Sequence, residues 1–333
     1  MLKRVDNFRQ QPVFQPIGFV DNLMNRGPFL SITAQIYHRR TPLVKRSGKI
    51  FSKMWKKLPI FAYLCCVKPM SQNPWMMVTV PHIAVASYPD ALPFIYGIRH
   101  APDFRVGELL AATPERCAEL FLEGETDLAL VPAVLVPDLH DADLVTEYCV
   151  GATGPSRSAL LLSNDAPESL RRVFIDPQSP TAAHLAAYVL GKRWGLTPQY
   201  IPLDDTEQLF RVETGDGFVL GGGKAADAEG LFARSMDLTG EWCAIEQLPV
   251  AMAVWVARKG TDPLHIEGLE YALTYGLEHT FEAVRESVPD EALLEIYGHL
   301  SNDIDYLFDL EKHKALKRLW SSGVKNALRT NPG

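Results

Sequence analysis

Small polar residues gather in three clusters, each directly after a short apolar run of the sequence. Hydroxyl groups and unpaired backbone N–H groups at the start of a helix bind carboxylates well, and an arginine among them can pair with a second carboxylate. These residue types therefore predict a site for a small anion. The clusters are Ser87-Tyr88-Pro89-Asp90, Gly154-Pro155-Ser156-Arg157-Ser158 and Asp176-Pro177-Gln178-Ser179-Pro180-Thr181.

Each cluster also has a purely structural interpretation. Ser179 and Thr181 can serve only as caps of the helix that follows them. Arg157 can be a solvated hinge residue, and Gly221-Gly222-Gly223 can be no more than a turn. Sequence alone leaves both interpretations open.

Sequence motifs for metals and cofactors are absent. The nine histidines form no H-E-x-x-H and no pair at ligand spacing, and the five cysteines form no C-x-x-C. Gly221-Gly222-Gly223-Lys224 falls short of a phosphate-binding loop, because Phe218 stands where the first glycine is required and Ala225 replaces Ser or Thr. We therefore expect no metal and no cofactor.

The elements that must position these clusters are short strands alternating with helices, a pattern typical of βαβ units and mainly parallel sheets. Thr113 is a predicted helix cap, with Gly124 as the stop signal of that helix. A second helix is predicted from Thr181 to Trp194, and apolar residues at spacings of three or four predict helices beyond residue 257. The predicted strands include 83–87, 128–131, 158–163, 173–175, 217–220 and 250–257.

This order of elements predicts an α/β fold in two lobes. Residues 78–157 plus 258–320 form lobe 1, and 158–257 form lobe 2, inserted through two crossing strands. In such folds small ligands bind in the cleft between the lobes, against strand ends and helix starts.

The first 77 residues differ in charge from the rest. They contain 13 Lys and Arg against two Asp, a net charge of +11, whereas the other 256 residues contain 20 Lys and Arg against 38 Asp and Glu, a net charge of −18. The acidic part argues against a nucleic-acid partner. With no continuous apolar face, residues 1–77 are predicted to be a poorly ordered basic extension.

Three interpretations of the extension compete: a targeting peptide, a basic binding arm, and a translated upstream region with the functional start at Met70, Met76 or Met77. The apolar run 58–67 is too short to cross a bilayer. We favour the upstream region, and expect a cytoplasmic protein that does not bind membranes. The oligomeric state is not predicted.

Several stretches, in order along residues 82–280, resemble chorismate dehydratase, the periplasmic-binding-protein-like enzyme of the futalosine route to menaquinone. The resemblance implies a two-lobed periplasmic-binding-protein-like fold of type II with additional C-terminal helices. The matching stretches are Ser87-Tyr88-Pro89-Asp90-Ala91-Leu92-Pro93-Phe94, Gly124-Glu125-Thr126-Asp127-Leu128-Ala129-Leu130-Val131-Pro132, Tyr148-Cys149-Val150-Gly151-Ala152-Thr153-Gly154, Asp176 to Thr181, and Leu248-Pro249 to Ala253-Val254-Trp255.

The activity implied by this resemblance is a lyase reaction that removes water from chorismate, a small dianion, to give 3-[(1-carboxyvinyl)oxy]benzoate without a cofactor. Asp90 is then the candidate catalytic acid or base. The candidate substrate-binding residues are Ser87, Tyr88, Ser156, Arg157, Ser158, Ser179, Thr181 and Gly222.

The chain departs from the family pattern where Asp90-Ala91 replaces an Asn-Thr pair. Two alternatives therefore remain. One is a solute-binding protein of the same fold that binds a small anion without turnover. The other resembles 1,4-dihydroxy-6-naphthoate synthase, whose chemistry would require a histidine in the cleft, with His184 as the nearby candidate.

Overall fold

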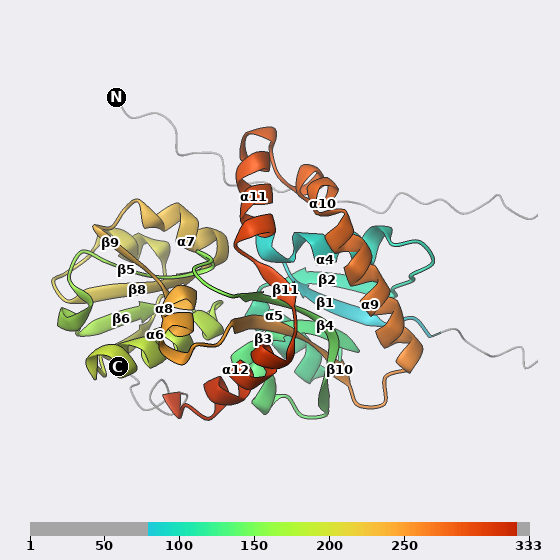
Figure 1. The fold of residues 1–333 in the computed structure, drawn as a ribbon, viewed down its shortest axis with the longest axis horizontal. Helices are drawn as coiled ribbons and strands as arrows, with labels where there is room; N and C mark the ends of the chain where they lie inside the picture. The colour runs from blue at the N-terminus through green and yellow to red at the C-terminus, as the bar shows by residue number, and fades with distance from the viewer. Residues whose placement is uncertain (1–78, 325–333) are drawn as a thin grey trace, which may run out of the picture. The chain divides into compact units, whose positions relative to one another are not determined.

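The computed structural model describes residues 79–324, apart from the Thr206 side chain. They belong to one compact unit, Met77–Gly333, built around two β-sheets (Figure 1). The predicted basic extension, residues 1–77, lies outside the described part. Within that part, no helix is both long enough and apolar enough to cross a membrane.

The first sheet has six strands in the order β11-β4-β10-β3-β1-β2. β1 pairs in parallel with β2 and β3, whereas β10 runs antiparallel to β3 and β4. The strands are β1 (His82–Ala86), β2 (Glu108–Ala112), β3 (Leu128–Pro132), β4 (Ala142–Ala152), β10 (Val250–Arg258) and β11 (Asp305–Leu307).

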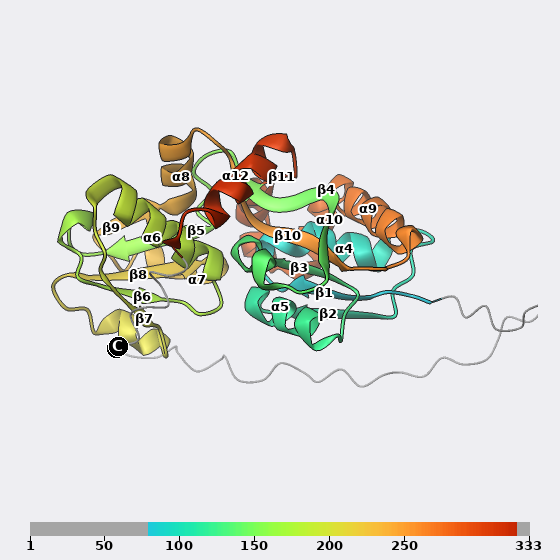
Figure 2. The same ribbon diagram turned by 90° about the horizontal axis from the view of Figure 1, so that it is seen from below.

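Helices cover both faces of the first sheet, as Figure 2 shows. One face packs against α4 (Leu92–His100) and α9 (Pro263–Glu278), which cross so closely that a Cβ on Gly97 would lie 1.9 Å from the Ala272 carbonyl oxygen. The other face packs against α5 (Pro114–Glu123) and α12 (Leu310–Trp320). The remaining elements near this sheet are η1 (Pro89–Ala91), η2 (Ala133–Asp138), α10 (Thr280–Ser287) and α11 (Asp290–Asn302).

The second sheet has five strands in the order β7-β6-β8-β5-β9. Its buried side chains pack against α6 and α8 on one face and against α7 on the other. Its elements are β5 (Ala159–Ser163), η3 (Pro167–Ser169), β6 (Arg172–Ile175), α6 (Pro180–Trp194), β7 (Gln199–Pro202), η4 (Thr206–Phe210), β8 (Asp216–Gly221), α7 (Gly222–Glu229), β9 (Arg234–Asp237) and α8 (Leu238–Glu246).

The predicted helix signals are confirmed. The Thr113 hydroxyl accepts a hydrogen bond from the Arg116 backbone N–H, and α5 ends at Gly124 with φ of 81°. α6 likewise ends at Gly195 with φ of 65°. In both helices a glycine takes the left-handed conformation that closes a helix, because it carries no Cβ to clash.

The strand predicted at the end of lobe 2 lies in the first sheet, not in the second. β10, predicted within 158–257, belongs to the first sheet, where Val250 pairs with Ala152 of β4. β5, predicted as a crossing strand, instead lies between β8 and β9 in the second sheet. The division of the chain into two lobes stays a prediction, and these pairings put the second change of sheet before residue 250.

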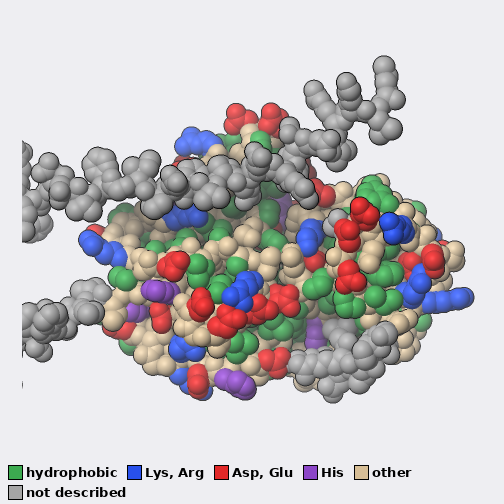
Figure 3. All heavy atoms as spheres, turned by 180° about the vertical axis from the view of Figure 1, so that it is seen from behind, with side chains coloured by type: hydrophobic (Ala, Val, Ile, Leu, Met, Phe, Trp, Pro, Cys, Tyr) green, Lys and Arg blue, Asp and Glu red, His purple; other side chains and the backbone are tan. Residues whose placement is uncertain are grey.

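Acidic and basic side chains are interspersed over the face drawn in Figure 3. Several charged side chains of the described part form ion pairs at the surface, such as Arg116 with Glu119 and Glu123 at 2.8 Å. Exposed pairs of this kind contribute little to stability, about 0–1 kcal/mol each. Other charged groups are buried, among them Asp90, Asp176 and Asp216.

Candidate functional site

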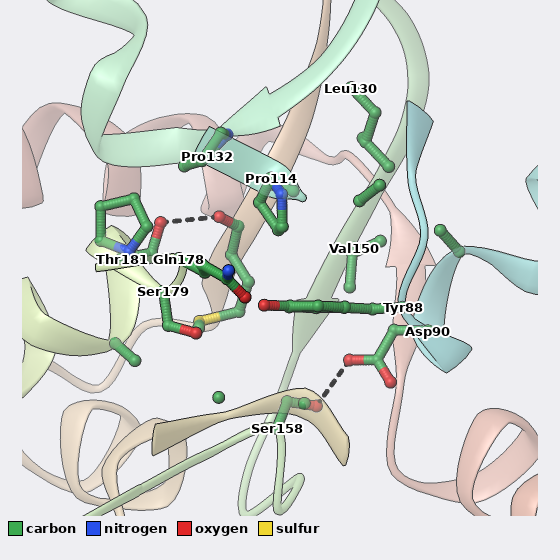
Figure 4. Close-up of a pocket in the computed structure, with 18 residues that line it drawn as sticks. Tyr88, Asp90, Pro114, Leu130, Pro132, Val150, Ser158, Gln178, Ser179 and Thr181 are labelled. Atoms are coloured by element: carbon green, nitrogen blue, oxygen red, sulfur yellow. Dashed lines mark hydrogen bonds between the residues drawn. The ribbon is translucent and has the colours of Figure 1, made fainter. Parts of the chain in front are cut away.

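A pocket of about 550 Å³, including open solvent at its mouth, lies where strand ends of the two sheets meet. Much of its wall is apolar, and a few polar groups point into it, which is the usual composition of a small-molecule site. Figure 4 shows the apolar residues Pro114, Leu130, Pro132 and Val150 on one side and Ser158 on the other.

Six of the nine predicted site residues line this pocket. They come from the turn after β1, the residue before β5, the start of α6 and the start of α7. Because strand ends and helix starts converge there, residues from all three sequence clusters line one pocket. The six residues are Tyr88, Asp90, Ser158, Ser179, Thr181 and Gly222.

The other three predicted residues are not among the lining residues. Ser87 is exposed at the end of β1. Ser156 is 1% exposed, and its hydroxyl lies 3.0 Å from the Thr239 hydroxyl. Arg157 points to solvent and forms an ion pair with Glu229 at 2.8 Å. The arginine proposed as a counter-charge for the ligand is thus paired with a carboxylate at the surface.

Asp90 is held in place from three sides. Its Oδ2 accepts a 2.9 Å hydrogen bond from the Ser158 hydroxyl, and its Oδ1 lies 3.2 Å from Nε2 of His299. Its carbonyl accepts a 2.9 Å hydrogen bond from the hydroxyl of Tyr306. With 8% of its surface exposed, Asp90 is a buried carboxyl group whose two oxygens both have partners.

His299 is the residue that sequence reasoning missed. It lies on α11, and its Nδ1 is 3.2 Å from Oδ2 of Asp303. Burial lowers the pKa of His299, but the hydrogen bonds and charges of Asp90 and Asp303 raise it more, so that the net shift is upward. The one signal in the sequence is the spacing of four between His299 and Asp303 on a predicted helix.

Across the pocket, the hydroxyl groups of the third cluster, Asp176 to Thr181, already donate hydrogen bonds within the protein. Ser179 Oγ donates to Oδ2 of Asp176 at 3.1 Å, and Thr181 Oγ1 donates to the Met252 carbonyl at 2.9 Å. Ser179 occupies the N-cap position of α6, as one interpretation of the sequence expects, but its side chain makes no capping hydrogen bond. The first-turn backbone N–H groups of Thr181 and Ala182 have no acceptor within the helix, and both residues line the pocket.

Lys224 contacts two residues on this side of the site. Its Nζ donates to Oδ1 of Asp176 at 3.0 Å and to Oε1 of Gln178 at 2.8 Å. Because the Gln178 oxygen accepts from Lys224, the amide nitrogen of Gln178 is the end left to donate to a ligand. Gln178 lines the pocket, and it too was missed as a site residue.

Tyr88 projects its hydroxyl toward Gln178 and Ser179 (Figure 4). This hydroxyl is shielded from solvent and makes no hydrogen bond of acceptable geometry within the described chain, although Ser179 is close enough to affect its pKa. Burial raises the pKa of Tyr88, and the contact with Ser179 lowers it partly. An unpaired buried hydroxyl at a pocket wall is a donor or acceptor suited to a ligand.

Comparisons with known proteins address the family and the fold of this chain. A family model described as menaquinone biosynthesis matches residues 81–324, well over half of the 333 residues. The chain belongs to this family. Membership in the menaquinone biosynthesis family supports a role in that pathway. The sequence resemblance to chorismate dehydratase is narrower, because it names one enzyme of such a pathway.

Solved structures similar to this menaquinone biosynthesis family member show the fold. Protein AF1704 from Archaeoglobus fulgidus has a TM-score of 0.56 at 14% identity, covering 74% of this chain and 98% of its own. The Candida albicans CA3427 gene product, described as having the generic periplasmic binding protein fold, has a TM-score of 0.53 at 13% identity, with coverages of 76% and 96%. The periplasmic aliphatic sulphonate binding protein SsuA from Escherichia coli has a TM-score of 0.53 at 12% identity, with coverages of 76% and 93%. The predicted periplasmic-binding-protein-like α/β fold is therefore confirmed.

Proposed function

We propose that this protein removes water from chorismate to give 3-[(1-carboxyvinyl)oxy]benzoate. The proposal starts from membership in the menaquinone biosynthesis family. It is supported by a pocket with an apolar wall, a carboxyl group on one side and helix N–H groups on the other.

The reaction needs little beyond positioning. A proton leaves the ring carbon that bears the enolpyruvyl ether, hydroxide leaves the neighbouring carbon, and together they are released as one water. The ring becomes aromatic, so the product supplies the driving force. The protein has to hold the substrate with the C–H and C–OH bonds aligned and to assist the proton transfers.

Different polar groups of the pocket would bind the substrate carboxylate, contact its ring and transfer protons. The amide nitrogen of Gln178 and the N–H groups of Thr181 and Ala182 would bind a substrate carboxylate. Tyr88 would pack against the ring and donate its unpaired hydroxyl. Asp90 would act at the reacting carbons, either as the base or as the acid that protonates the departing hydroxide.

The observation that carries the proposal is the buried position of Asp90. It lines the pocket with 8% of its surface exposed, and it has Ser158 and His299 as hydrogen-bond partners. A carboxyl group held in this way, opposite a cluster of donors, is suited to proton transfer on a bound anion.

The test is incubation of the purified full-length chain with chorismate. Mass spectrometry should detect a product lighter by one water, and the ultraviolet spectrum should change to that of a benzoate. The Asp90→Asn variant serves as the control for contaminating activity. Binding of chorismate without product would contradict the proposed reaction and favour the second candidate.

That second candidate is a protein that binds a small anion without turnover. It is favoured by Asp90-Ala91, which replaces the Asn-Thr pair expected from the resemblance. The solved structures include a sulphonate-binding protein of the same fold. For the alternative that resembles 1,4-dihydroxy-6-naphthoate synthase, the histidine named from the sequence, His184, is buried in α6 and is not a lining residue of this pocket.

A further inference from the structure

His299 lies between two carboxyl groups. Its Nε2 is 3.2 Å from Oδ1 of Asp90, and its Nδ1 is 3.2 Å from Oδ2 of Asp303. A neutral imidazole carries one N–H and can donate to only one of them, while its other nitrogen would face an oxygen lone pair. Both contacts are favourable only when the three groups together hold two protons.

The surroundings decide where these protons are. The Asp303 side chain is 39% exposed, so that water can solvate its carboxyl group. Oδ2 of Asp90 accepts a hydrogen bond from Ser158 and its Oδ1 faces Nε2 of His299, so both oxygens of Asp90 are already engaged as acceptors. The remaining arrangement is an imidazolium that donates from both nitrogens to two carboxylates.

This arrangement changes the charge of the pocket wall. Alone, the buried carboxylate of Asp90 would repel an anionic ligand. With a protonated His299 beside it, the Asp90–His299 pair is neutral. The net upward shift of the His299 pKa, in spite of its burial, agrees with this charge state.

We propose that His299 is a positioning and charge-compensating residue of the site. As an imidazolium it holds Asp90 in place and cancels its charge, so that the pocket binds an anion well only while His299 keeps its proton. This role rests on the proposed function for the identity of the anion. It goes beyond that function because it makes binding depend on a residue outside the pocket lining.

Other groups contact or interact with the residues around His299. The guanidinium of Arg157 interacts with Glu295 and Asp303 of the α11 region. Tyr306 of β11 contacts the Asp90 carbonyl, and α10 meets α11 through the ring contact of Phe281 with Tyr297. Asp90 and Asp303 are therefore the charged groups in direct contact with His299, and Arg157 and Tyr306 act on it only through these two residues.

The sign of the pH dependence follows from the raised pKa. The charged form of His299 is fully present below the ordinary histidine pKa of about 6.5. It is lost as the pH rises through the higher pKa of the folded protein. Anion affinity should fall over the same range.

The first experiment is an NMR titration of the histidines in the full-length chain without ligand. The His299 resonance is assigned by its absence in His299→Gln. Its pKa should lie above about 6.5 in the wild type and should fall in both Asp90→Asn and Asp303→Asn. A wild-type pKa at or below that value overturns the proposal, whether or not chorismate binds.

The second experiment measures chorismate binding by calorimetry from about pH 6 to about pH 9. His299→Gln keeps a donor for Asp90 but carries no charge, so the dissociation constant should rise about tenfold near neutral pH and lose its pH dependence. Asp303→Asn, at a half-exposed position, should shift the pH profile of chorismate affinity to lower pH, because Asp303 helps to raise the pKa of His299. In an Asp90→Asn background, His299→Gln should change the affinity less than about twofold.

His100→Gln is the matched control, because His100 also lies beside a carboxylate, at 3.3 Å from Glu286, but on exposed surface. It should leave both profiles unchanged. A pH profile that is the same in wild type and His299→Gln overturns the role of His299. A wild type that binds no chorismate at any pH counts instead against the proposed function, and the NMR titration then decides the state of His299.

Discussion

The Ser158 hydroxyl donates a 2.9 Å hydrogen bond to Oδ2 of Asp90, 68 positions earlier in the chain. The bond joins the residue before β5 in the second sheet to the turn after β1 in the first. Ser158→Ala leaves one oxygen of a buried carboxyl group without its donor. We expect a loss of about 1–3 kcal/mol in the free energy of unfolding, measured by urea denaturation, together with weaker chorismate binding.

Ser163→Ala is the control for this substitution. Ser163 lies at the other end of β5, is also buried, and its hydroxyl donates to the Asp216 carbonyl at 3.0 Å. Its loss should lower stability without changing chorismate affinity. Equal effects of the two substitutions on affinity would show that the Ser158–Asp90 bond has no special role in the site.

Asp90→Asn separates binding from turnover. It removes a negative charge from the pocket and keeps an oxygen that can accept from Ser158. Chorismate affinity by calorimetry should be equal to that of the wild type or higher, whereas turnover should fall by at least about 100-fold. Weaker binding would count against the position of Asp90 at the bound substrate.

Tyr88→Phe tests the unpaired hydroxyl. Among residues 79–324 this hydroxyl has no hydrogen-bond partner of acceptable geometry, so its removal should leave the free energy of unfolding unchanged or raise it by up to about 1 kcal/mol. Chorismate affinity should fall about five- to tenfold if the hydroxyl binds the ligand. An unchanged affinity would mean that the hydroxyl does not contact the substrate.

Gln178→Glu tests the amide donor. The oxygen that accepts from Lys224 is retained, while the amide nitrogen is replaced by a second, negatively charged oxygen. Binding of the dianion should weaken by at least about tenfold, because a donor becomes a repelling group. Wild-type affinity in this variant would place the substrate carboxylates elsewhere.

Gly222→Ala and Gly223→Ala form a matched pair at the start of α7. Gly222 has φ of +54°, and a Cβ there would lie 3.0 Å from Cδ2 of Tyr88, whereas a Cβ on Gly223 meets nothing within 4 Å. We expect Gly222→Ala to cost about 1–2 kcal/mol and to weaken chorismate binding by displacing the Tyr88 ring. Gly223→Ala should change neither quantity appreciably, as measured by urea denaturation and calorimetry.

The local structure was largely predictable because its signals are local. Thr113 and Gly124 mark the ends of α5, and Gly195 marks the end of α6, since caps and left-handed glycines depend on neighbouring residues alone. The sheet to which β10 belongs was not predictable in this way. A continuous apolar run such as 250–257 is equally compatible with either sheet, because periodicity does not reveal the partner strand.

The same distinction holds for the candidate site. Tyr88, Ser158 and Thr181 follow strand ends or begin a helix, and these positions converge in α/β folds. His299 approaches Asp90 from a helix 209 positions later, and no local rule connects two such distant positions. Arg157 failed as a counter-charge because Glu229, another distant residue, pairs with it at the surface.

The antiparallel pairing of Ala152 with Val250 determines how the segment between them could be replaced. Everything between these two residues leaves the first sheet and returns to it at neighbouring points. A segment whose two ends lie close together can be replaced by another segment of the same kind without disturbing the first sheet, because its points of connection do not move.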